Sequence, residues 1–87
     1  MAVVTLPSQL RERAGSEGNV SADGATLGQV LTDLERRFPG LVGWILDESG
    51  QIRRHVNVFV NGERVPIGSA VSPEDEIQVL PAISGGD

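Results

Sequence analysis

The stretch Thr26–Gly40, TLGQVLTDLERRFPG, predicts one long helix around which the rest of this 87-residue chain can be arranged. Its apolar residues recur at i, i+3, i+4, i+7 and i+11, which places them along one side of a helix. They are Leu27, Val30, Leu31, Leu34 and Phe38. Thr26 and Gln29 have the spacing of a capping box, and Pro39-Gly40 predicts the helix end. A single apolar stripe has to be buried, so we expect it to pack on a β-sheet.

Two strands are predicted before this helix. Ala2–Leu6 is short, apolar and rich in β-branched residues, and Pro7 ends it. Ser8–Asn19 is polar and contains two glycines, which predicts a loop with one helical turn around Leu10. Val20–Ala22 is the second predicted strand.

Three strands are predicted after the helix. Val56–Val60 alternates, with its valines on one face and Phe59 on the other. Asn61-Gly62 is a strong hairpin signal, so we expect Glu63–Val65 to return as the neighbouring strand. Glu76–Leu80 is the last strand, with its isoleucine and valine facing inward.

An apolar cluster, Leu41–Leu46, separates the long helix from these later strands. Its spacing is irregular, and we interpret it as a short helix. Trp44 is the only tryptophan, and we expect it in the core because large aromatic side chains commonly anchor cores. Asp47–Gln51 is a predicted loop, and His55 is expected only to flank the strand that follows it.

The predicted order is strand, strand, helix, hairpin, strand. One helix covers only one face of a sheet, so the fold class is α+β, a mixed sheet with one main helix packed on one face. The first and last strands can pair in parallel at the centre, which is the β-grasp, or ubiquitin-like, arrangement. We expect residues 1–81 to form this domain and residues 82–87 to form a flexible C-terminal tail.

Composition argues against several classes of function. Twelve acidic residues against seven basic ones give a net charge of −5, and an acidic surface repels nucleic acid. With no cysteine and one histidine, a transition-metal site would rest on carboxylates alone, so we expect no metal and no cofactor. No apolar run is long enough to span a bilayer, and the N-terminus lacks a basic signal stretch. We therefore expect a cytoplasmic protein with no membrane partner.

The chain also lacks the side chains of an enzyme active site. Glu74, Asp75 and Glu76 are consecutive, so we expect a solvated turn and no acid/base pair. No glycine-rich phosphate loop occurs. A chain of this size has little room for a deep active site, and we expect no catalysis by the chain itself.

The remaining candidate is Gly85-Gly86, close to the end of the chain. Glycine has no Cβ, so a diglycine can thread a narrow channel and bring its backbone close to a reactive centre. A terminal carboxylate there could be activated by ATP as an acyl adenylate and then captured by a nucleophile. Taken alone, the pair could also be an ordinary frayed terminus.

With these residues the chain resembles the MoaD/ThiS family of ubiquitin-like sulfur carriers. The resemblance covers nearly the whole chain. It is carried by VSADGATLG (20–28), LERRFPG (34–40), VFVNGE (58–63) and DEIQVLPAISGG (75–86). The middle, with IRRHVN at 52–57, is most similar to the CysO-type carriers of actinobacterial cysteine synthesis.

The resemblance implies a mechanism. An E1-like adenylating enzyme of the MoeB/ThiF type activates Gly86, the acyl attachment point beside the slender Gly85, and sulfur then replaces AMP to give a thiocarboxylate. A sulfur-accepting biosynthetic enzyme passes that sulfur on, in the synthesis of cysteine, molybdopterin, thiamine or a natural product. Leu80 matches the exposed residue that such carriers present to the adenylating enzyme. Strand alternation also points Leu80 and Phe59 away from the helix, so these two and Ile83 are the expected partner-binding residues.

Asp87 departs from the family pattern, which ends at the second glycine. We expect Asp87 to be removed before activation, with a JAMM-type metalloprotease as the peptidase, unless Asp87 does not belong to the natural chain. Two alternatives to the sulfur carrier stay open. One is a protein modifier in which Gly86 is joined to lysine amines, and the other is an inert β-grasp binding module.

Overall fold

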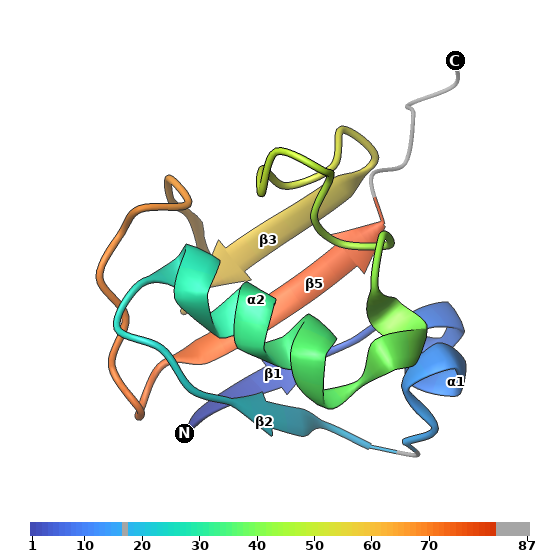
Figure 1. Ribbon diagram of the computed structural model, residues 1–87. Helices are drawn as coiled ribbons and strands as arrows, with labels where there is room; N and C mark the ends of the chain where they lie inside the picture. The colour runs from blue at the N-terminus through green and yellow to red at the C-terminus, as the bar shows by residue number, and fades with distance from the viewer. Residues whose placement is uncertain (17, 82–87) are drawn as a thin grey trace.

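A five-stranded mixed sheet forms the frame of the molecule in the computed structural model (Figure 1). The elements are β1 (Ala2–Thr5), α1 (Ser8–Ala14), β2 (Val20–Ala22), α2 (Leu27–Arg37), the 3₁₀ helix η1 (Pro39–Leu41), β3 (Val56–Val60), β4 (Glu63–Arg64) and β5 (Glu76–Pro81). The structure describes residues 1–16 and 18–81. The predictions for the tail, 82–87, and for its residues Ile83, Gly85, Gly86 and Asp87 therefore lie outside the described residues.

The strand order is β2-β1-β5-β3-β4. β1 and β5 pair in parallel at the centre, with Val4 opposite Ile77. The other three pairings are antiparallel. This topology confirms the predicted α+β class and the β-grasp fold.

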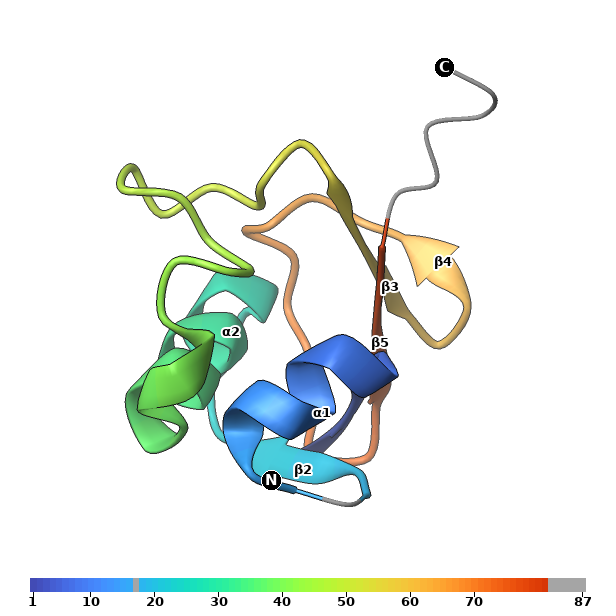
Figure 2. The same ribbon diagram turned by 90° about the vertical axis from the view of Figure 1, so that its right-hand side faces the viewer.

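α2 covers one face of the sheet, as Figure 2 shows with the sheet seen close to edge-on. Four residues of its apolar stripe, from Leu27 to Leu34, are completely buried, and Phe38 at the helix end is half-buried. Ile77 and Val79 are completely buried beneath the helix. Each fully buried aliphatic side chain contributes about 1.5–3 kcal/mol, so this layer is the main source of stability.

The start of α2 confirms Thr26 as the helix cap, but the reciprocal bond of Gln29 goes to the residue before the cap and not to Thr26 itself. The backbone N–H of Gln29 donates to Oγ1 of Thr26 (3.2 Å), and the Gln29 side-chain oxygen accepts from the backbone N–H of Ala25 (2.8 Å). The first bond satisfies one of the N–H groups that a helix start leaves without an intrahelical partner, and the second ties the residue before the cap to the helix.

The segment after β1 differs from the prediction. It forms the seven-residue helix α1, whereas a loop with one helical turn was expected. Pro7 accepts backbone hydrogen bonds from Leu10 and Arg11, and Gly15 ends the helix with a left-handed φ of 72°. Leu10 is the buried anchor of α1. With so little apolar periodicity the helix signal lies in its two ends, proline before and glycine after.

Leu41–Leu46 does not form the expected short helix. η1 ends at Leu41 and the chain then turns through Gly43, which has a φ of 84°. The turn sends Ile45 into the core and leaves Trp44 41% exposed. The expectation of a core tryptophan is wrong, because the Trp44 ring packs against the guanidinium of Arg13, 3.6 Å from the ring centroid.

The Asn61-Gly62 turn confirms the predicted hairpin, with φ of 52° and 85° at its two residues. Positive φ at both positions gives a turn whose twist matches that of the flanking strands. The Asn61 side chain also accepts from the backbone N–H of Glu76 (2.9 Å) and donates to Asp75 (2.9 Å). The hairpin is therefore tied to the start of β5, which fixes the register between β3 and β5.

Gly40→Ala is expected to lower the free energy of unfolding by about 3 kcal/mol, because of overpacking against an immobile backbone. A Cβ at Gly40 would lie 2.0 Å from the backbone oxygen of Arg13, where α1 packs on η1. Gly68→Ala is the matched control, since no described atom lies within 4 Å of a Cβ there. Urea unfolding of both variants measures the difference, and equal midpoints would contradict the packing described for the α1–η1 contact.

Candidate functional site

The sheet face opposite α2 carries the two residues expected to bind a partner within the described chain. Leu80 on β5 is 42% exposed, and Phe59 on β3 is half-buried. Asn57 pairs with Leu80 and Phe59 pairs with Gln78, so Leu80 and Phe59 are diagonal neighbours on adjacent strands. The structure thus brings the two residues together on one surface, called here the open face.

Arg64 on β4 changes how much of this surface is apolar. Its guanidinium lies 5.7 Å from the centroid of the Phe59 ring and donates a hydrogen bond to the Asn57 side chain. Phe59 is therefore partly covered, and Leu80 is the more accessible apolar side chain. The signal for Arg64 is in the sequence, because the two-residue turn at Asn61-Gly62 sets the register that places Arg64 opposite Phe59.

β5 brings Leu80 to the point where the tail begins. The strand runs to Pro81, which pairs with Val56 at the start of β3. Gly86 is five residues beyond Pro81, so even a fully extended chain carries it at most about 17 Å away. An enzyme that holds Gly86 has to bring its own surface close to this edge of the sheet.

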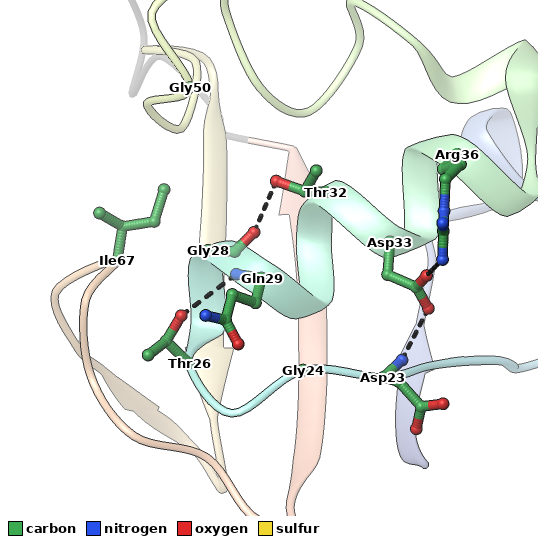
Figure 3. Close-up of a pocket in the computed structure, with 10 residues that line it drawn as sticks. All are labelled: Asp23, Gly24, Thr26, Gly28, Gln29, Thr32, Asp33, Arg36, Gly50 and Ile67. Atoms are coloured by element: carbon green, nitrogen blue, oxygen red, sulfur yellow. Dashed lines mark hydrogen bonds and ion pairs between the residues drawn. The ribbon is translucent and has the colours of Figure 1, made fainter.

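A separate cavity lies elsewhere, over the first turns of α2 (Figure 3). It is an open hollow of about 670 Å³. Its polar side chains serve the fold: Thr26 caps the helix, Thr32 donates to the backbone oxygen of Gly28 (2.8 Å), and Asp33 turns toward Asp23 and Arg36. We regard this hollow as a structural feature of the helix start.

Asp33 is a buried carboxylate that joins α2 to the end of β2. It accepts hydrogen bonds from the backbone N–H of Asp23 (2.8 Å), from Arg36 and from Arg37 Nε (2.6 Å). The Asp23 N–H first, and then the two guanidinium groups, hold the pKa of Asp33 well below its usual range. Arg36 and Arg37, in the last turn of α2, thus neutralise a buried charge.

This lowered pKa predicts an acid-sensitive fold. A carboxyl whose pKa is lower in the folded state makes its full contribution to the free energy of unfolding above its unfolded pKa of about 3.9. That contribution is lost as the pH falls below this value towards the folded pKa. Asp33→Asn is therefore expected to lower the urea midpoint at neutral pH and to flatten its decline below about pH 4. Unfolding measured from pH 7 to pH 2.5 tests this, with Glu48→Gln as the exposed-loop control. A decline as steep as that of the wild type would contradict the role given to Asp33.

Of the remaining candidates, His55, Glu74 and Asp75 lie in the segments before β3 and β5, whereas Glu76, expected in a turn, is the first residue of β5. His55 is exposed immediately before β3, as expected. Asp75 accepts from the backbone N–H of Ser72 (2.8 Å) and from Asn61, which holds its pKa below the usual value. Within residues 1–16 and 18–81, no three histidine, cysteine or carboxylate side chains are grouped so as to hold a metal ion. No helix in these ranges is both long and apolar enough to cross a membrane.

Known proteins resemble the chain over almost its full length. The ThiS family model matches residues 4–86. The sulfur carrier protein CysO of Mycobacterium tuberculosis is 38% identical over 89 residues, covering 95% of this chain and 96% of that protein. The small archaeal modifier protein 1 of Haloferax volcanii is 37% identical over 83 residues, with 93% and 95% covered.

Solved structures agree with the sequences. The crystal structure of the Amycolatopsis orientalis BexX/CysO complex contains a chain that superposes with a TM-score of 0.86 at 33% identity, covering 99% of this chain and 100% of that one. Both the sequence match and the backbone match extend across the whole β-grasp domain. The chain belongs to the ThiS family, a family of small sulfur carriers and ubiquitin-like modifiers.

Proposed function

We propose that the chain is a sulfur carrier that acts as a substrate of partner enzymes. In the first step, a carboxylate oxygen of Gly86 attacks the α-phosphorus of ATP on an E1-like adenylating enzyme of the MoeB/ThiF type, and pyrophosphate leaves. Sulfur at the level of hydrosulfide then attacks the acyl carbon and displaces AMP, which leaves a thiocarboxylate on Gly86. A sulfur-accepting biosynthetic enzyme finally takes the sulfur from this group.

The observation that carries this proposal is where the family match ends. It runs to residue 86, so its last matched position is Gly86, and Asp87 stands outside it. The relative that is 38% identical over nearly the whole chain is itself named a sulfur carrier. We therefore place the reactive carboxylate on Gly86 and propose that a peptidase of the JAMM metalloprotease class removes Asp87.

The open face supports the same proposal. Leu80 is the apolar residue immediately before Pro81, the last described residue of β5. A large apolar side chain near the centre of an interface often dominates binding. We propose that Leu80, with Phe59 beside it and Ile83 in the tail, contacts the adenylating enzyme.

A protein modifier is the second candidate, and one observation favours it. The small archaeal modifier protein 1 of Haloferax volcanii is 37% identical, which is close to the identity with the sulfur carrier. A modifier would use the same adenylated Gly86 but pass the acyl group to a lysine amine. The two functions differ only in the nucleophile that captures the activated terminus.

Intact mass of the protein isolated from its own cells distinguishes these functions. A form that ends at Gly86 and carries one sulfur in place of one oxygen supports the carrier. Peptides of other proteins with a Gly-Gly remnant on lysine support the modifier. If only the intact Asp87 terminus is found, without sulfur, the inert binding module is the correct interpretation.

A further inference from the structure

A second apolar surface lies on the helix side of β5, next to the point where the tail begins. It is a groove of about 90 Å³. Its lining includes Pro7, Leu10, Trp44, Val56, Leu80 and Pro81. The groove forms where α1, the segment after η1, the start of β3 and the end of β5 meet, next to the point from which the chain leaves the sheet. Core residues form its floor, Trp44, Leu80 and Pro81 are its exposed apolar members, and the exposed Gln9 and His55 stand at its rim.

Trp44 is held at this groove in an exposed position. Its side chain is 41% exposed, and the Arg13 guanidinium lies 3.6 Å from the ring centroid. A cation–π contact of this kind holds the ring without burying it. Tryptophan and arginine are among the side chains most enriched at the energetic centres of protein interfaces. An exposed, held tryptophan therefore marks a binding surface better than a mobile one would.

Leu80 makes the groove continuous with the open face. It lines the groove and, through strand alternation, also belongs to the sheet face that carries Phe59. A stable protein interface buries about 800 Å² on each partner. Leu80 and the partly covered Phe59 form only a small part of such an area, so a partner that docks there has to contact neighbouring surface as well.

The length of the tail indicates which neighbouring surface is contacted. Gly86 lies at most about 17 Å beyond Pro81. An enzyme that holds the Gly86 carboxylate at ATP therefore has the entrance of its channel close to Pro81. Pro81 is itself part of the groove, so the rim of that channel comes against Trp44 as well as against Leu80.

We propose that the adenylating enzyme fills this groove with an apolar side chain from the rim of its tail-binding channel. The docking surface then extends from the open face, around Leu80, to Trp44. A carboxylate on the enzyme beside that side chain would face Arg13. This inference rests on the proposed function, and it adds a second anchor on the opposite side of β5.

Trp44→Ala tests the inference in a chain that ends at Gly86, with Val42→Ala as the matched control. Val42 is 61% exposed in the same segment but does not line the groove. ATP–pyrophosphate exchange is measured with the purified E1-like enzyme of the same organism. We expect Trp44→Ala to raise the KM for the carrier chain at least about tenfold with kcat unchanged, because an interface anchor is lost. Val42→Ala should leave both values unchanged.

A direct signal comes from Trp44 itself, because it is the only tryptophan of the chain. Incorporation of 5-fluorotryptophan gives one ¹⁹F resonance from the groove. We expect this resonance to shift or broaden when the unlabelled adenylating enzyme is added. A shift that depends on the concentration of the carrier alone would identify a second copy in the groove and overturn the proposal.

The kinetic outcomes separate this inference from the function on which it rests. If Trp44→Ala leaves KM unchanged while the wild type is adenylated normally, the groove proposal is wrong and the carrier function stands. An effect of Trp44→Ala on sulfur transfer but not on exchange would assign the groove to the sulfur-accepting enzyme. That result would also overturn the groove proposal. If the Gly86-ending wild type supports no exchange at all, both proposals fall together.

Discussion

The chain that ends at Gly86 is expected to support ATP–pyrophosphate exchange at least about a hundredfold faster than the 87-residue chain. One extra residue moves the terminal carboxylate by about 3.5 Å. Reacting atoms have to be placed to within about 1 Å, and a misplacement of that size already slows a reaction about a hundredfold. The Asp87 side chain adds a second negative charge beside the triphosphate, which glycine avoids.

Asp87→Gly separates the two causes. This variant keeps the extra length but removes the side-chain charge and bulk, so low activity would assign the effect to the position of the carboxylate. Recovery of activity would assign it to the side chain. Each form has to be checked by intact mass before and after the assay. Equal activity of an uncleaved 87-residue chain would refute the processing step and leave the fold untouched.

The fold could be predicted because the spacing of apolar residues along the sequence shows which side of each helix or strand is buried. The spacing of Leu27 to Leu34 identifies a helix with one buried side, and the alternation of Val56–Val60 identifies a strand with one buried face. The Asn61-Gly62 turn then sets which strands are neighbours. Each of these signals lies within a few consecutive residues, so the sequence displays it directly.

The errors concern contacts between distant segments. Tryptophan is a residue type that is common in cores, so the sequence favours burial of Trp44. Its exposure is decided by the turn at Gly43 and by the contact with Arg13, which lies on α1. The length of α1 was underestimated, because Leu10 is its single buried residue in the structure and one residue gives no periodic apolar stripe in the sequence. Local pattern cannot reveal which remote side chain will cover or hold a residue.

The candidate site divides in the same way. Strand alternation was enough to place Leu80 and Phe59 on one face. It did not reveal that Arg64 lies over Phe59, nor that Leu80 also borders a groove built from α1 and the segment after η1. A surface assembled from several elements requires the tertiary structure, whereas a surface on adjacent strands requires only their register.

Leu80→Arg is expected to raise the KM for the carrier chain in the exchange assay about a hundredfold while the protein stays folded. Leu80 is 42% exposed, so the arginine can reach water in the free protein, but docking would bury its charge against an apolar surface without a partner. Val3→Arg is the matched control. Val3 is 39% exposed on the same sheet face as Leu80. It lies opposite Glu76 at the start of β5, whereas Leu80 is the second-last residue of that strand, beside the tail. Both variants should unfold near the wild-type urea midpoint, and only Leu80→Arg should lose affinity. If the two substitutions raise KM equally, the effect reflects the added positive charge on the open face in general, and Leu80 is not the docking residue.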